Sequence, residues 1–292
     1  MLNSDPLVSI GLPVRNASTR ILDVVKSVLA QDHEHLELVI SDNASTDDTE
    51  EVCRELAGSD KRIVYFRHPE NIGMTNNFVH AIGIASGTFF RWIGDDDELE
   101  PDYVSRCLRV FADDPQFIMV TTGLSYTGPD GVTESAVYDG TGLRSDDPIE
   151  RLNEWLRLLN ESHLLIDPLY GLVRRVPVAA IPRRVRIRED ETFATKLALA
   201  GAWGHVPEVL AHRGWKLQNI KKIARGLGVP TWQSHFANTL QAREMLRWLP
   251  QADLTEEQRQ QARSAIYGMY LRRQRRTLAH RSRKLLRMAT LR

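Results

Sequence analysis

The sequence has few cysteines, no long apolar run and no net charge of either sign. Cys53 and Cys107 lie far apart, and neither has a second cysteine or a histidine nearby at metal-ligand spacing. A disulfide framework beyond one pair is excluded, so we expect two small core residues in a reducing compartment. Because the chain has no run of about 18 apolar residues, no membrane-spanning helix is expected.

The N-terminal residues MLNSDPLVSI lack the basic start and apolar stretch of a secretory signal peptide, so a cytoplasmic location is expected. The 292 residues, 42% of them apolar and 26% charged, suffice for one large domain or two small ones with a buried core. This ordinary composition excludes disordered, collagen-like and coiled-coil chains.

The zero net charge conceals an uneven distribution. Basic and acidic residues number 38 each, but eleven Arg and Lys residues follow Glu257 and no Asp or Glu does. The first 257 residues therefore hold 27 basic against 38 acidic residues. An acidic body with a basic tail follows.

Apolar periodicity predicts alternating strands and helices up to about residue 122. The expected strands are 7–13, 36–41, 62–66, 88–93 and 117–122, and the expected helices are 21–29, one ending near 56, 75–85 and 101–111. Ser18 or Thr19 is the expected N-cap of the first helix, and Ser45 with Asp48 resembles a capping box for the second. This order is typical of a mainly parallel sheet with helices on both faces.

The remaining sequence is less regular. Residues 124–150 are rich in Gly, Ser, Thr and Asp and are expected to form loops. A helix near 148–160, an extended segment at 169–174 and a helix near 190–200 follow, and the pattern from 221 onward is helical and basic. The sequence therefore predicts one α/β domain with a helical C-terminal extension.

Polar residues follow three of the predicted strands: Pro13–Asn16, Asp42–Asn43 and Asp95–Asp97. Ligands bind at the carboxyl ends of strands in an open parallel sheet. Turns and helix caps use the same residue types, so each group alone has that alternative explanation. The triple acidic run differs, because adjacent carboxylates repel one another and favour a bound cation. A solvated acidic loop remains the alternative.

Four ordered motifs, VSIGLPVRN, ELVISDNASTDDT, NIG and ASGTFFRWIGDDDELEPDYV, resemble the inverting family 2 glycosyltransferases of the GT-A fold. They span residues 7–110, and a weaker likeness continues through YGLVRR, EDETFATKLALAG and PEVLAHR. The resemblance implies a GT-A domain over 1–220, with a nucleotide-sugar half at about 1–123 and an acceptor half at about 124–220. Residues 221–292 would form the basic helical extension.

The implied activity moves a sugar from a nucleotide-diphosphate donor, UDP being the first choice, to an acceptor hydroxyl. Bacterial cell-envelope glycan or glycolipid synthesis is the implied setting, with a glycan or lipid-linked acceptor. By the family pattern, Pro13 and Asn16 flank the nucleotide pocket. Asp42 would accept a hydrogen bond from the base, and Asn71 would border the donor site. Arg15 stands where many relatives have Tyr, and would stack or contact phosphate.

Asp95, Asp96 and Asp97 occupy the family's DxD position. Hard oxygen ligands at this point imply Mn²⁺ or Mg²⁺ beside the leaving diphosphate. Counting back from Pro101, Asp96 matches the metal ligand and Asp95 the ribose or donor contact. Asp97 is the second DxD carboxylate, because Gly94 stands where the family's first aspartate often stands.

Many relatives carry a further metal-binding histidine, and registration on Arg213 places Lys216 there. Lys216 would pair with the diphosphate directly, and His212 is a nearby substitute ligand. Asp190 matches the family's general base, which takes the proton of the acceptor hydroxyl. From the residues alone, Glu189, Asp190 and Glu191 also fit an acidic first helical turn.

The basic tail has open interpretations: contact with an anionic membrane surface at the inner face of the plasma membrane, a helix folded onto the acidic body, or a homodimer contact. Nucleic-acid binding is disfavoured, because aromatic interleaving and known motifs are missing. Two rival functions are a sugar nucleotidyltransferase and a non-catalytic nucleotide-binding scaffold. GLPVRNAS lacks the Gly-rich basic loop of the first, and Lys216 keeps the second open.

Overall fold

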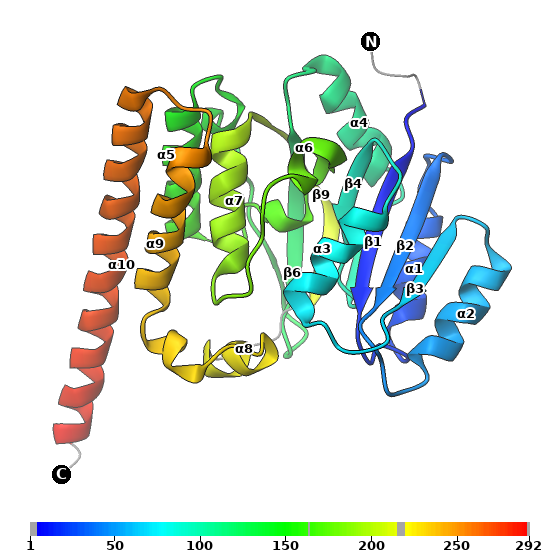
Figure 1. The fold of residues 1–292 in the computed structure, drawn as a ribbon, viewed down its shortest axis with the longest axis horizontal. Helices are drawn as coiled ribbons and strands as arrows, with labels where there is room; N and C mark the ends of the chain where they lie inside the picture. Colours follow the sequence, from blue (N-terminus) through cyan, green and yellow to red (C-terminus); the bar gives the residue numbers. More distant parts are fainter. Residues whose placement is uncertain (1–4, 163, 215–219, 291–292) are drawn as a thin grey trace.

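The structure is a computed structural model that describes residues 5–162, 164–214 and 220–290 (Figure 1). Lys216 therefore lies outside the described residues. A nine-stranded sheet has the order β3–β2–β1–β4–β8–β6–β9–β5, with β7 paired to β6. The strands are β1 (Val8–Val14), β2 (Leu36–Asp42), β3 (Ile63–Arg67), β4 (Phe89–Trp92), β5 (Asp97–Leu99), β6 (Met119–Thr127), β7 (Thr133–Ser135), β8 (Leu172–Arg174) and β9 (Trp203–Gly214).

The first four sheet neighbours, β3, β2, β1 and β4, run parallel and match the expected strands within about two residues. Successive side chains on a strand point to opposite faces, so both faces of a covered sheet are apolar. In β2, Leu38 and Ile40 belong to one buried cluster and Val39 to another. The predicted two-faced parallel sheet is confirmed here.

Helices cover both of these faces. They are α1 (Ile21–Leu29), α2 (Thr49–Ser59), α3 (Met74–Ile84) and α4 (Tyr103–Asp113). In Figure 1, α3 lies on the near side of the sheet next to β1, and α1 lies behind the sheet. Apolar residues at helical spacing, such as Ile21, Val24, Val25 and Val28 of α1, face the sheet and are buried.

The second half of the sheet departs from the expected pattern. Strand β8 runs antiparallel between β4 and β6, and β5 pairs antiparallel with β9. Residues 124–150 are not only loops, because β6 continues to Thr127 and forms a hairpin with β7. A Cβ at Gly123 would lie 2.7 Å from the carbonyl oxygens of Pro207 and Glu208, and the β6–β9 register shifts at this glycine. The absence of a side chain at Gly123 therefore permits a bulge.

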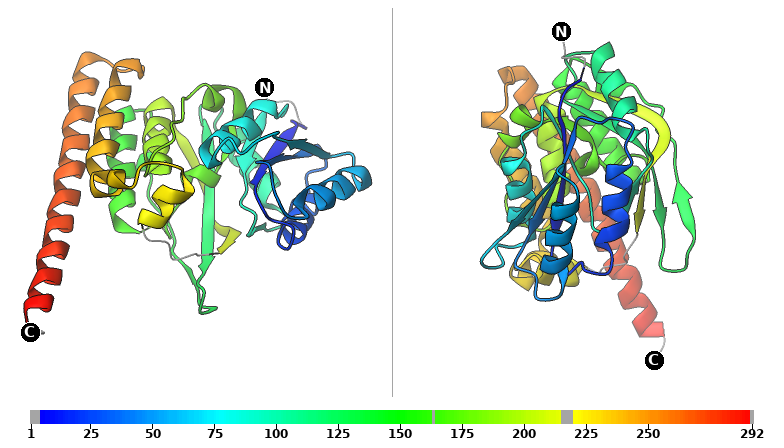
Figure 2. Two further views of the ribbon diagram at one scale, coloured as in Figure 1. Left: turned by 60° about the horizontal axis from the view of Figure 1, so that its bottom comes forward. Right: turned by 90° about the vertical axis from the view of Figure 1, so that its right-hand side faces the viewer.

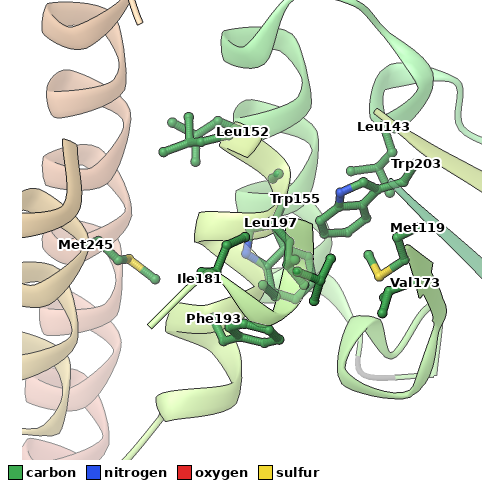
Figure 3. Packing of buried hydrophobic residues seen from close by; sticks show 14 of the residues in the cluster. Met119, Leu143, Leu152, Trp155, Val173, Ile181, Phe193, Leu197, Trp203 and Met245 are labelled. Carbon is green, nitrogen blue, oxygen red and sulfur yellow. The ribbon is translucent and has the colours of Figure 1, made fainter. Parts of the chain in front are cut away.

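A second layer of helices flanks the sheet beyond β6. It contains α5 (Pro148–Glu161), α6 (Arg175–Ala179), α7 (Glu189–Ala200), α8 (Ile220–Gly226), α9 (Ala237–Trp248) and α10 (Glu256–Thr290). Trp155, Phe193, Leu197 and Met245 pack in one cluster that joins α5, α7 and α9 (Figure 3). The C-terminal helices thus share a core with α5 and α7, while the C-terminal end of α10 extends past the body (Figure 2).

Both predicted helix caps are wrong. The N-cap of α1 is Arg20 and that of α2 is Asp48, and neither side chain caps its helix. The Ser45 hydroxyl instead donates to Asp42, and it accepts from the backbone N–H of Asn16. Ser45 therefore bonds to residues at the strand ends, although its local sequence favours a helix cap.

The two cysteines confirm the expected core role. Both are fully buried and unpaired with each other, and burial raises the pKa of each thiol to about 12. Among the described residues, no helix combines the length and apolar character that a membrane crossing needs.

Candidate active site

The loops after β1 and β2 are tied together at the carboxyl end of the sheet. Asn16 adopts a left-handed backbone (φ 54°), and its side-chain oxygen accepts from the Thr46 N–H at 2.9 Å. Asp42 is fully buried. Its Oδ1 accepts from Ser45, and its Oδ2 accepts from the Tyr65 hydroxyl at 2.9 Å. Asp42 therefore shapes this loop from inside.

The other residues that the family resemblance assigns to the donor site lie around the same loops. Pro13 is half-buried, whereas Arg15 is exposed. Asn71 accepts from the Gly73 N–H at 3.0 Å, and Asn43 accepts from the Ile72 N–H at 2.8 Å. Asn43, which follows Asp42 in sequence, thus ties the loop before α3 to the end of β2.

The three aspartates after β4 have three different environments. Asp95 accepts a hydrogen bond from Arg20 Nε at 3.1 Å, and the two side chains form an ion pair. Asp97 is buried and accepts from the Gly94 N–H at 2.9 Å, which closes the turn. The Asp96 carboxylate lies beside Gly214, where a Cβ would approach its Oδ2 to 3.0 Å. Because Gly214 has no side chain, the Asp96 carboxylate can lie against the end of β9.

Arg213 joins this acidic turn to the loop before β8. Its Nε donates to Asp97 Oδ1 at 3.1 Å, and its Nη1 forms an ion pair with Asp167. The guanidinium stacks on the Tyr170 ring, 3.8 Å from the centroid. The Tyr126 hydroxyl donates to the same Asp167 carboxylate at 3.1 Å. The buried carboxylate of Asp97, the half-buried carboxylate of Asp167 and two aromatic rings thus hold one guanidinium.

His212 faces away from this cluster, because neighbouring residues of a strand point to opposite faces. Its Nδ1 lies 2.8 Å from Ser125 Oγ, and its Nε2 lies 2.9 Å from Glu100 Oε1. Within residues 5–162, 164–214 and 220–290, no three His, Cys, Asp or Glu side chains form a group that could hold a metal ion. The structure therefore does not bring His212 and the acidic turn together as a ligand set.

A cavity of about 610 Å³ opens between the sheet and the second helical layer. Its polar lining includes Asp167, Arg213, Gly214 and Asp190, and its apolar lining includes Trp155. Asp190 lies in the first turn of α7, as predicted, and its side chain is open to solvent in the cavity. The cavity therefore connects the proposed base to the end of β9, where Asp96 lies.

The carboxylates on either side of Asp190 have cationic partners. Glu189 pairs with Arg183, and Glu191 pairs with Arg188 and with Arg273 of α10. Asp190 has no ion-pair partner in the part of the chain that the structure describes. The packed protein around it, together with the charges of Glu191, Asp167 and Glu189, raises the Asp190 pKa to about 6. A carboxylate with such a pKa is suited to accept a proton near neutral pH.

Arg213, Asp167 and Arg20 are site residues that the sequence analysis did not assign. Arg213 stands directly after His212 in the PEVLAHR run, and alternation along the strand would have marked one of the two as facing the site. Asp167 and Arg20 are isolated polar residues in sequence, and their importance comes only from partners 46 and 75 positions away.

Comparisons with known proteins place this geometry in a family. The model of glycosyl transferase family 2 matches residues 9–154, which is half of the chain. A putative teichuronic acid biosynthesis glycosyltransferase of *Bacillus subtilis*, TuaG, is 31% identical over 151 residues, covering 51% of this chain and 60% of that protein. The chain spans less than two thirds of the length of the first curated relatives that it matches.

Solved structures share the fold over nearly the whole chain. *Staphylococcus aureus* TarS (residues 1–349) in complex with UDP matches with a TM-score of 0.67 and 17% identity, covering 89% of this chain and 70% of that one. The mannosyltransferase PcManGT of *Pyrobaculum calidifontis*, in complex with GDP-Man and Mn²⁺, matches with a TM-score of 0.54 and 15% identity over 91% of this chain and 74% of that one. The GT-A fold expected from the sequence is confirmed.

Replacing Arg213 tests its part in joining the acidic turn to the loop before β8. We expect Arg213→Met to lower the free energy of unfolding by about 3 kcal/mol, because buried Asp97 and half-buried Asp167 would both lose their cationic partner. Urea unfolding measures this change. Arg106→Met breaks the exposed pair with Glu208 and should cost less than about 1 kcal/mol. Equal losses in the two variants would contradict the assigned role of Arg213.

The Asp190 pKa predicts a pH-dependent stability difference. A carboxyl whose pKa rises from 3.8 to about 6 on folding opposes folding once it is ionised. Asp190→Asn should therefore be more stable than the wild type at pH 8. The difference should shrink as the pH falls through 6 and vanish near pH 4. Thermal unfolding at these pH values measures it, and a difference that does not change with pH would contradict the raised pKa.

Proposed function

We propose that this chain, which belongs to glycosyl transferase family 2, transfers a sugar with inversion from a nucleotide-diphosphate donor to an acceptor hydroxyl. The single observation that carries the proposal is Asp190, a carboxylate that has no ion-pair partner among the described residues and has a pKa near 6, in a cavity that reaches the end of β9. The setting we propose is bacterial cell-envelope glycan or glycolipid synthesis, as the name of the relative TuaG suggests for that protein.

The donor would lie at the carboxyl ends of β1, β2 and β4, along the loops that carry Pro13, Asn16 and Asn71. UDP is our first choice, since TarS has been solved with it. Arg15, exposed beside this loop, would stack on the base or contact a phosphate. Ser45 and Tyr65 already donate to Asp42, so a direct bond between Asp42 and the base would compete with these donors.

The acidic turn suits a divalent cation that arrives with the diphosphate. Mg²⁺ and similar ions are commonly held by one or two carboxylates plus substrate phosphates and water, so a group of three protein ligands is not needed. Asp96 would hold the ion, and Asp95 would contact the ribose or join as a ligand by exchanging Arg20. Asp97 orients the turn through Gly94 and Arg213. When bound, Mn²⁺ or Mg²⁺ would neutralise the charge of the leaving diphosphate.

Asp190 would accept the proton of the acceptor hydroxyl as that oxygen attacks the sugar on the face opposite the diphosphate. Attack from the opposite face inverts the anomeric carbon. With a pKa near 6, Asp190 is mostly ionised at pH 7 and is still more basic than an ordinary aspartate. Arg183 and Arg188 form ion pairs with the neighbouring glutamates, so Asp190 remains available to the substrate.

The acceptor is proposed to be a glycan or a lipid-linked saccharide at an anionic membrane surface. Tyr267, Leu271 and Leu278 lie four and seven positions apart on one exposed face of α10. Arg275 is exposed on the same helix, and the sequence beyond it is strongly basic. An apolar stripe with flanking arginines suits the interface of an anionic leaflet.

Substitution of the proposed catalytic residues tests the transferase. Release of nucleoside diphosphate from UDP-, GDP- and dTDP-sugars, with and without a membrane lipid extract, measures turnover. We expect Asp190→Asn to lower kcat by about 10²–10⁴-fold, as the loss of a general base does. Asp96→Asn should lower it by at least about 10²-fold and weaken the response to Mn²⁺. Glu98→Gln, an exposed member of the same acidic run, is the matched control and should keep its activity. Full activity in Asp190→Asn would exclude it as the base.

Sedimentation with lipid vesicles tests the membrane contact. The chain should bind vesicles that contain phosphatidylglycerol, bind phosphatidylcholine vesicles poorly, and lose binding in high salt. Leu271→Asp with Leu278→Asp should weaken binding at least about tenfold, because apolar contact area is lost. Leu22→Asp alters an exposed leucine of α1 and should have no effect. Equal binding to both vesicle types would contradict the proposed surface.

A further inference from the structure

The C-terminal helix reaches the turn that carries Asp190. Arg273 of α10 donates from Nη1 to Glu191 Oε2 at 2.5 Å and to Gln241 Oε1 of α9 at 2.7 Å. Gln241 donates from Nε2 to the same Glu191 oxygen at 2.7 Å. Arg188 donates to the other Glu191 oxygen, Oε1, also at 2.7 Å. Side chains from three separate segments thus hold the carboxylate next to Asp190.

This cluster is an interior one, unlike the other contacts of the basic tail. The Arg273 side chain is 10% exposed, and Gln241 is fully buried. Arg273 also donates to the side chain of Asn160 and the carbonyl of Leu159, at the end of α5. Burial of an arginine is costly unless its hydrogen bonds are satisfied, and here α5, α7 and α9 together supply the acceptors.

We infer that Arg273 is a positioning residue: from the C-terminal helix it fixes the first turn of α7 and offsets the charge of Glu191 beside Asp190. This inference rests on the proposed role of Asp190 as the base. It assigns to the basic tail a function inside the enzyme, separate from any contact with a membrane.

The charges around Asp190 predict in which direction its pKa should move when Arg273 or Glu191 is replaced. Glu191 and Glu189 on α7 and Asp167 on the facing loop disfavour its ionisation. Arg273 carries the opposite charge close enough to interact with Asp190, and Arg183 and Arg188 offset Glu189 and Glu191. Loss of Arg273 leaves Glu191 less compensated, so the Asp190 pKa should rise. Loss of the Glu191 charge should lower it.

The test is a carboxyl-carbon NMR titration of the full chain, in which the Asp190 signal is identified by its loss in Asp190→Asn. We expect Arg273→Gln to raise the Asp190 midpoint by about half a pH unit or more, and Glu191→Gln to lower it. The double variant should return close to the wild-type midpoint. Arg273→Lys keeps the charge, so its midpoint should lie close to that of the wild type. Arg272→Gln, one position along α10 and exposed, is the matched control and should leave the midpoint unchanged.

The kcat/KM profile gives the second readout, because its acidic limb should move with the same midpoints. Unchanged midpoints in both Arg273→Gln and Glu191→Gln would overturn the inference. A loss of activity in Arg273→Gln without a shift would show a purely structural role and would also overturn it. The titration needs no turnover. If Asp190→Asn kept full activity while the midpoints moved as expected, the proposed base would fail and the electrostatic coupling would stand.

Discussion

The guanidinium of Arg213 is the contact on which the site depends. Asp97 belongs to the acidic turn after β4, and Asp167 belongs to the loop before β8, so one cation links these two segments. Burial of these charges is tolerated because each carboxylate has further donors, the Gly94 N–H for Asp97 and the Tyr126 hydroxyl for Asp167. Arg213 also stacks on Tyr170, which limits its movement. Arg213 and Asp167 both line the cavity, so this bridge forms part of its wall.

The carboxylates of the candidate site differ in whether other side chains of the protein hold them. Asp42, Asp97, Glu189 and Glu191 are held by internal donors, whereas Asp190 faces the cavity with no ion-pair partner in the described ranges. The residue before α7, Arg188, has a left-handed backbone with φ 61°, which costs free energy for a residue that is not glycine. The strained start of α7 and the clamp on Glu191 together set where Asp190 points. The basic tail thereby contributes to the interior as well as to the surface.

Periodicity was enough to predict the elements of the parallel half, because β1, β2 and β4 are buried on both faces and each helix has one apolar face. It failed where a tertiary contact overrides the local pattern. Residues Asp97–Leu99 form strand β5 only because β9 lies beside them, and Ser45 leaves the cap position because Asp42 attracts it. The family motifs located Asp190 and the acidic turn. They assigned Asp96 and Asp97 different parts but gave no sign that Arg213, more than a hundred residues away, holds Asp97.

The central claim is a nucleotide-sugar site at the carboxyl ends of the strands, and calorimetric titration with UDP, GDP and dTDP tests it most directly. Each nucleotide is titrated with Mn²⁺ and with EDTA into the wild type and into Asp96→Asn. The account predicts saturable binding of one nucleotide, strengthened by Mn²⁺, with the metal effect lost in the variant. Failure of all three nucleotides to bind, with the protein folded and Mn²⁺ present, would contradict it.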